Sequence, residues 1–155
     1  MCKPLLLQKD AVICARVVQI IEKLLPQESI HILDVGSGEA SLLASVCSTL
    51  HDKHPMLKLT VEAIEPAALG AKFIRDKARG LRDASIDVHT HQKPLEDYLD
   101  SGTKKFDVIL CVHTMYFFEP ENWPNIINNL SRRLKPKGRA IASNSHQPVT
   151  AEPNL

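Results

Sequence analysis

The chain has 155 residues, 44% of them hydrophobic and 24% charged, a composition typical of one globular domain. Its 19 basic and 18 acidic residues leave a net charge of +1, so neither nucleic acid nor an anionic membrane is an expected partner. The four cysteines form no CxxC pair, and no apolar run is long enough for a signal peptide or a membrane span. These features argue against a disulfide framework or a metal site and predict a soluble, cytoplasmic protein.

Apolar residues recur along the chain in patterns that predict helices alternating with strands. Helices are predicted over about residues 13–24, 42–50, 67–79, 94–99 and 123–134, the third followed by Gly80 and the last ended by LKPKG at 134–138. Strands are predicted over residues 30–35, 57–64, 85–90, 106–112 and 139–143. This alternation indicates an α/β fold, a Rossmann-like doubly wound parallel sheet of about five strands with helices on both faces. Residues 1–143 would form this domain, followed by a polar tail at 144–155.

The stretch ILDVGSGEAS, residues 32–41, joins the first predicted strand to the next helix. Gly36 and Gly38 allow a tight turn and a close approach of the backbone to a ligand, and the helix behind them offers unpaired N–H groups. A dinucleotide-binding turn requires a third glycine at position 41, where this chain has Ser41. An NAD-linked oxidoreductase is therefore disfavoured.

A second acidic residue, Glu65, ends the next predicted strand in the sequence VEAIEP. The carboxyl ends of parallel strands share one edge of a sheet, so Glu65 is expected near the glycine turn. Its carboxylate could accept hydrogen bonds from the two hydroxyl groups of a ribose. The alternative is an exposed acid that favours the positive end of the following helix.

Together, ILDVGSGEA, VEAIEP, FDVILCVHTMYFF and LKPKG resemble the class I S-adenosylmethionine-dependent methyltransferases over about residues 10–143. More narrowly, KHPMLKLTVEAIEP and HTMYFFEPENW are similar to segments of the histamine N-methyltransferase family. The resemblance implies S-adenosylmethionine as the cofactor. That family continues for two strands beyond the fifth, so we expect this chain to lack its last two strands. Ala40 stands where these methyltransferases usually have a third glycine.

The resemblance also assigns roles to individual residues. The residues that it places at the cofactor are Asp34, Gly36, Gly38, Glu65, Gln92 and Val112. His113, Tyr116 and Phe117 match substrate-contacting positions, where His113 replaces the usual glutamine and Phe117 a tyrosine. His113 is also the candidate catalytic base, because an imidazole takes up a proton near neutral pH. The alternative for His113 is a strand-end side chain bonded to the backbone.

These observations predict an enzyme that methylates a nitrogen of a small amine or imidazole acceptor. The alternative is a truncated cofactor-binding module or pseudoenzyme without turnover. Because the fifth strand would lie at the edge of the sheet, its free N–H and C=O groups also predict self-association through that strand.

Overall fold

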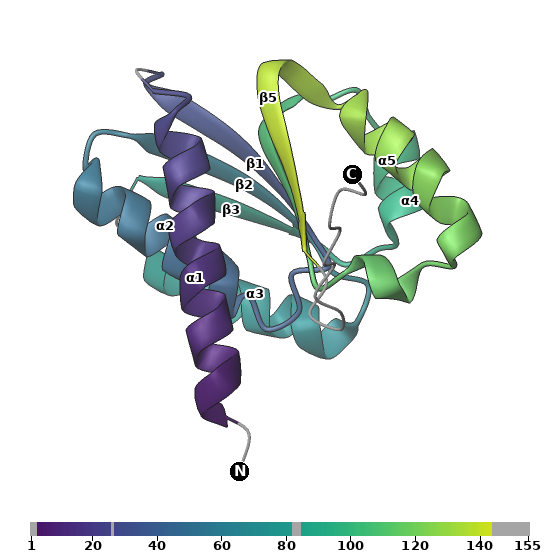
Figure 1. Ribbon diagram of the computed structural model, residues 1–155, viewed down its shortest axis with the longest axis horizontal. Coiled ribbons are helices and arrows are strands. Elements are labelled where there is room, and N and C mark those ends of the chain that lie inside the picture. Colours follow the sequence, from purple (N-terminus) through teal and green to yellow (C-terminus); the bar gives the residue numbers. More distant parts are fainter. Residues whose placement is uncertain (1–2, 26, 82–84, 144–155) are drawn as a thin grey trace, which may run out of the picture.

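The computed structural model describes residues 3–25, 27–81 and 85–143 (Figure 1). The predicted polar tail at 144–155 lies outside the described residues. Among the described helices, none is long and apolar enough to cross a membrane.

Five parallel strands form one sheet in the order β3-β2-β1-β4-β5, which confirms the predicted fold. The strands are β1 (Ser29–Val35), β2 (Lys58–Ile64), β3 (Ile86–His91), β4 (Phe106–Val112) and β5 (Leu134–Ser143). The first strand lies between β2 and β4, so the chain runs outward from β1 in both directions. At such a point the neighbouring connections leave to opposite sides, and a crevice opens beyond the carboxyl ends of the strands.

Helices cover both faces of the sheet (Figure 1). On one face lie α1 (Lys3–Glu22), α2 (Ser41–Lys53) and α3 (Ala68–Leu81), and on the other α4 (Leu95–Asp100) and α5 (Trp123–Ser131). Two short 3₁₀ turns, η2 (Met115–Phe117) and η3 (Pro120–Asn122), follow β4. Each helix buries its apolar stripe on the sheet, and this explains the three layers.

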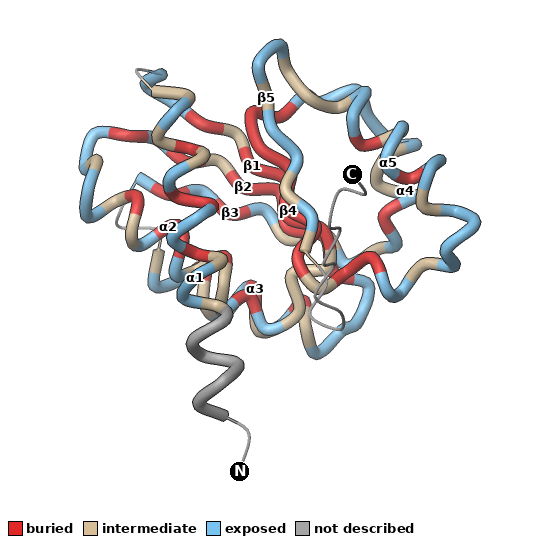
Figure 2. Tube along the Cα trace, in the orientation of Figure 1, coloured by how far each residue is buried: buried red, intermediate tan, exposed pale blue. Residues whose placement is uncertain are grey.

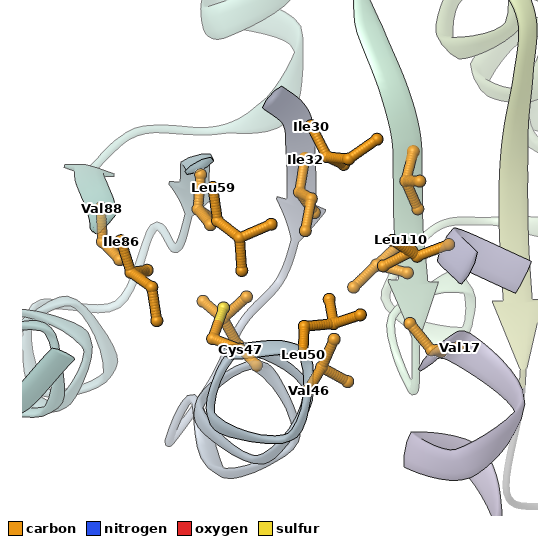
Figure 3. Packing of buried hydrophobic residues seen from close by; sticks show 14 of the residues in the cluster. Val17, Ile30, Ile32, Val46, Cys47, Leu50, Leu59, Ile86, Val88 and Leu110 are labelled. Atoms are coloured by element: carbon orange, nitrogen blue, oxygen red, sulfur yellow. The ribbon is translucent and has the colours of Figure 1, made fainter. Parts of the chain in front are cut away.

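The core consists of two apolar layers, one on each face of the sheet. In β1, Ile30 and Ile32 point to one layer and Leu33 to the other, as the alternation of a strand requires. Figure 3 shows Ile32 and Leu59 packing over α2. Burial on both faces explains the continuous apolar runs of the central strands, which are buried along most of their length (Figure 2).

The prediction was wrong at the end of the last helix. LKPKG belongs to β5 and does not end α5, which stops at Ser131. Leu134 pairs with Phe106, and Arg139 pairs with Val108. β5 therefore has more residues than β4 between these two pairs, and the register of the two strands shifts there. Buried Asp107 fixes this irregularity, because its carboxylate accepts a hydrogen bond from Lys135 at 2.8 Å.

The prediction of Gly80 as the residue after the third helix was also wrong, because Gly80 lies inside α3. Nothing lies within 4 Å of the place that its Cβ would occupy, so this glycine meets no packing requirement.

Candidate active site

A cavity of about 830 Å³ opens beyond the carboxyl ends of β1, β2 and β4. Its wall comes from the glycine turn after β1, the turn after β2, the start of α4 and the segment after β4, with α1 and α3 completing it. This is the place that the strand order favours for a ligand. The site therefore follows from the topology of the sheet, and its chemistry depends on the side chains around it.

The two glycines of the turn have different tasks. Both Gly36 and Gly38 have φ in the left-handed region, at 68° and 51°. A Cβ at Gly36 would lie 2.7 Å from Cγ2 of Thr114, whose hydroxyl donates to the carbonyl of Val35 at 2.6 Å. No atom lies within 4 Å of a Cβ built on Gly38, which lines the cavity. Gly36 thus lets the segment after β4 pack on the turn, and Gly38 leaves room for a ligand.

The turn ends at Ala40, which has φ 55° and ψ 22° although it carries a side chain. The left-handed conformation costs a non-glycine residue about 1–2 kcal/mol. Ala40 is buried, and the ammonium group of Lys77 holds both of its neighbours, donating to the Glu39 carbonyl at 2.5 Å and to the Ser41 hydroxyl at 2.7 Å. Contacts with α3 therefore keep the turn in a strained shape.

Glu65 is buried at the end of β2, and its carboxylate binds two backbone N–H groups. One oxygen accepts from Gly38 at 2.9 Å and the other from Ala67 at 2.9 Å, just before α3. Gly70 makes room for this side chain, since a Cβ there would lie 2.6 Å from the Cγ of Glu65. Each carboxylate oxygen can accept a further hydrogen bond, so the group is still able to bind a ligand.

Asp34, at the end of β1, is a second buried carboxyl group that lines the cavity. Burial raises its pKa to about 6, and the negative charge of Glu65 acts in the same direction. A positively charged ligand in the cavity would favour the ionised form of this group.

The charge on the cavity wall is of one sign. Five acidic residues line the cavity, and none of its described lining residues is lysine or arginine. The acidic residues are Asp10, Asp34, Glu39, Glu65 and Glu96. Most of the remaining wall is apolar or aromatic. Such a wall attracts cationic groups of a ligand.

The segment after β4 contributes one imidazole and two aromatic rings. His113 has φ 57°, and its backbone N–H donates to the carbonyl of Ser143 at 2.7 Å. The ring nitrogen Nδ1 is buried and has no hydrogen-bond partner among the described residues, while Nε2 lies 3.8 Å from a carboxylate oxygen of Asp10. Tyr116 and Phe117 line the cavity wall, and the centroids of their rings lie 4.4 Å apart. Phe117 is 73% exposed.

The structure brings together eight of the nine residues that the sequence assigned to the site. Those that line the cavity are Asp34, Gly36, Gly38, Glu65, Val112, His113, Tyr116 and Phe117. Gln92 is exposed and does not line the cavity, although Pro94, two residues later, does. The contact of Gln92 with the cofactor stays a prediction.

Sequence reasoning missed Asp10, Phe73 and Glu96, which also line the cavity. Glu96 follows the third strand closely, and Phe73 lies in the helix after Glu65, so their positions along the chain gave a weak signal. Asp10 gave none, because no local pattern shows that α1 reaches the carboxyl edge of the sheet.

A family model described as a methyltransferase domain matches residues 32–138. A putative class I S-adenosylmethionine-dependent methyltransferase from Listeria monocytogenes has a similar structure, with TM-score 0.64 and 20% identity over 84% of this chain and 44% of that one. The structure of MnmC2 from Aquifex aeolicus is also similar, with TM-score 0.64 and 21% identity over 84% of this chain and 48% of that one. Coclaurine N-methyltransferase, bound to N-methylheliamine and SAH, has a similar structure with TM-score 0.57 and 15% identity over 83% of this chain and 35% of that one. The chain thus spans less than half of each of these proteins, and no curated protein matches it.

Proposed function

The chain belongs to the methyltransferase domain family, and from this premise we propose that it transfers the methyl group of S-adenosylmethionine to a nitrogen atom of a small amine or imidazole acceptor. The acidic, partly aromatic cavity carries this proposal. The wall carries five carboxyl groups and neither lysine nor arginine among its described lining residues, so it attracts an acceptor with an ammonium or imidazolium group.

The residues of the cavity fit the cofactor. Gly38 leaves open space beside the turn, and the Glu65 carboxylate has lone pairs for the two ribose hydroxyls. The buried carboxyl group of Asp34 complements the positive charge of the cofactor. In this proposal Gly36 and Gly38 flank the methionine end, and Val112 and Gln92 lie toward the adenosyl end.

When bound, the cofactor would supply a methyl group on a positively charged sulfur atom, and this sulfur is a good leaving group. The chain's own residues then have three tasks: to align the acceptor, to exclude water and to receive one proton. Tyr116 and Phe117 offer ring faces that attract a flat or cationic acceptor. His113, which lines the same cavity, would accept the proton.

Calorimetric titration with S-adenosylmethionine, S-adenosylhomocysteine and NAD tests the cofactor. We expect the first two to bind and NAD to give no heat at the same concentration. Binding of NAD without binding of S-adenosylhomocysteine would overturn the assignment.

A methyl-transfer assay with matched acceptors tests the substrate class. Histamine and imidazoleacetic acid share the imidazole ring but carry opposite charges on their side chains. We expect faster methylation of the cationic compound than of the anionic one, because the five carboxyl groups of the wall attract a cationic side chain. Preference for the anionic acceptor would show that the charge argument is wrong.

The outermost strand favours a second candidate function, cofactor binding without turnover. None of the ten residues of β5 is buried, in contrast to β4, which is buried throughout. The strand that accepts a hydrogen bond from the N–H of His113 is therefore little covered by other described elements. A single-turnover assay with excess protein and the same amines separates the candidates, because a binding module would bind S-adenosylhomocysteine and yield no methylated product.

A further inference from the structure

We propose that Asp10 of α1 is a positioning residue, which orients the imidazole of His113 and stabilises its protonated form during methyl transfer. The inference rests on the proposed function, and it adds a residue from the other end of the chain to that site. Four observations carry it: the distance between the two groups, their shared cavity, the backbone conformation of His113 and its unpaired ring nitrogen.

The two side chains meet at the edge of the sheet where the strands end. A carboxylate oxygen of Asp10 lies 3.8 Å from Nε2 of His113, and both residues line the cavity. The side chains are 41% and 28% exposed, so solvent screens the pair only in part. Figure 1 shows α1 extending beyond the level at which the strands end, which brings its first half to this edge.

The backbone of His113 is held in a conformation that its own residue type disfavours. Its φ of 57° lies in the left-handed region, and the hydrogen bond from its N–H to Ser143 keeps it there. Neighbouring Thr114 is anchored as well, because its hydroxyl donates to the carbonyl of Val35. Strained residues of this kind cluster at functional sites, where the surrounding structure holds a side chain in a required direction.

The ring nitrogens of His113 have unequal surroundings. Nδ1 is buried and has no partner among the described residues, so an acceptor in the cavity cannot reach it. Nε2 lies beside the carboxylate of Asp10, and both residues line the cavity. Nε2 is therefore the atom at which His113 would receive a proton, with the Asp10 carboxylate next to the new N–H group.

Proton transfer accompanies formation of the bond to the methyl carbon. The acceptor N–H bond breaks and its proton moves to Nε2 of His113, while the electron pair left on nitrogen forms the bond to the methyl carbon. The electrons of the carbon–sulfur bond stay on the sulfur. His113 is then an imidazolium beside the Asp10 carboxylate, and it returns its proton to water after the product leaves.

Other ionisable groups face the same cavity and contribute to its field. They are Asp34 and Glu39 at the glycine turn, Glu65 after β2, Glu96 on α4 and Tyr116 after His113 itself. The four carboxylates stabilise a charged His113 in the same direction as Asp10 does. Among the described acidic residues, Asp10 is the one whose carboxylate lies within 4 Å of the ring, so its replacement removes the nearest negative charge.

The test compares Asp10→Asn and Asp10→Glu with Asp97→Asn, which makes the same charge change on an exposed residue of α4 that does not line the cavity. The position of the hydrogen on the His113 ring is followed by the ¹⁵N NMR shifts of its ring nitrogens at one fixed pH, with His113→Asn identifying the signals. We expect these shifts to change in Asp10→Asn, to return toward the wild-type values in Asp10→Glu and to stay unchanged in Asp97→Asn.

Activity supplies a second measurement. We expect Asp10→Asn to lower kcat about 10–100-fold, while the affinity for S-adenosylhomocysteine is unchanged. Unaltered ¹⁵N shifts of the His113 ring in Asp10→Asn and in a second variant, Asp10→Ser, would overturn the inference. Failure of the proposed function is distinct: the wild type would then not bind S-adenosylhomocysteine, whatever the His113 ring shifts show.

Discussion

Glu65 accepts a hydrogen bond from the backbone N–H of Gly38 at 2.9 Å. The sequence assigned both residues to one ligand, and the structure shows that they also hold each other. The carboxylate at the end of β2 thereby fixes the turn at the end of β1, so the cavity is partly formed before any ligand enters. A change at either residue affects the shape of the site as well as its contacts.

Glu65→Ala is expected to weaken binding of S-adenosylhomocysteine by about 1.5–3 kcal/mol, the range for hydrogen bonds to a charged group. Because Gly38 and Ala67 lose their acceptor, the variant should also unfold more easily by about 1 kcal/mol. Calorimetry and urea unfolding measure the two effects. An unchanged dissociation constant would remove Glu65 from the ribose role.

Gly70→Ala should impair binding although Gly70 makes no polar contact with a ligand. Its added Cβ would lie 2.6 Å from the Cγ of Glu65, so the carboxylate must move away from the glycine turn. Gly80→Ala is the matched control on the same helix, since no atom lies within 4 Å of its Cβ. We expect the control to stabilise α3 by about 0.5–1 kcal/mol and to bind S-adenosylhomocysteine normally. Equal affinities in the two variants would contradict this account.

Ala40→Gly should raise the free energy of unfolding by about 1 kcal/mol, because glycine adopts a φ of 55° without strain. Ser85→Gly, at φ 57° and remote from the cavity, is the control and should give a similar gain. Ala40→Leu should block the cavity, and normal binding by that variant would show that the turn does not contact the ligand. Thermal melting and calorimetry check all three.

The raised pKa of Asp34 should make the free energy of unfolding depend on pH. Its pKa of about 6 in the folded chain exceeds the unfolded value of about 3.9, so folding favours the protonated form. The stability that this group contributes is present below about pH 4 and is lost as the pH rises through about 6.

Asp34→Asn removes that loss. Without ligand, the variant should be more stable than the wild type at pH 8 by as much as about 2–3 kcal/mol and nearly equal to it at pH 4. Urea unfolding at both pH values measures the difference. A constant difference between pH 4 and pH 8 would mean that Asp34 does not titrate in this range.

The exposed strand β5 should promote self-association. Its residues are exposed or half-buried, and it is the outermost strand of the described sheet. Sedimentation at rising concentration should show dimers, which Ala142→Lys should abolish because a charge on an edge strand disfavours pairing. Thr103→Lys adds the same charge in an exposed loop before β4 and should leave the dimers intact. A monomer at all concentrations would refute the prediction.

The sequence by itself determined the parallel α/β fold, the glycine turn and the acid that follows the second strand. These features depend on local patterns: apolar runs in buried strands, helical spacing of apolar residues, and glycines where the backbone needs a positive φ. β4 was predicted with its bounds as observed, because a short, mostly apolar run fits a strand that is buried on both faces. Glu65 was found because the ends of parallel strands share one edge.

Only the tertiary structure decided how distant segments meet. LKPKG was assigned to a helix end because proline and glycine stop helices, yet Leu134 pairs with Phe106 of β4 and the segment belongs to β5. The packing of Thr114 on Gly36, and of α1 beside His113, leaves no mark on the local pattern. Periodicity records which face of an element is buried. It does not record which residue from another element covers that face, and that choice is made when the layers pack.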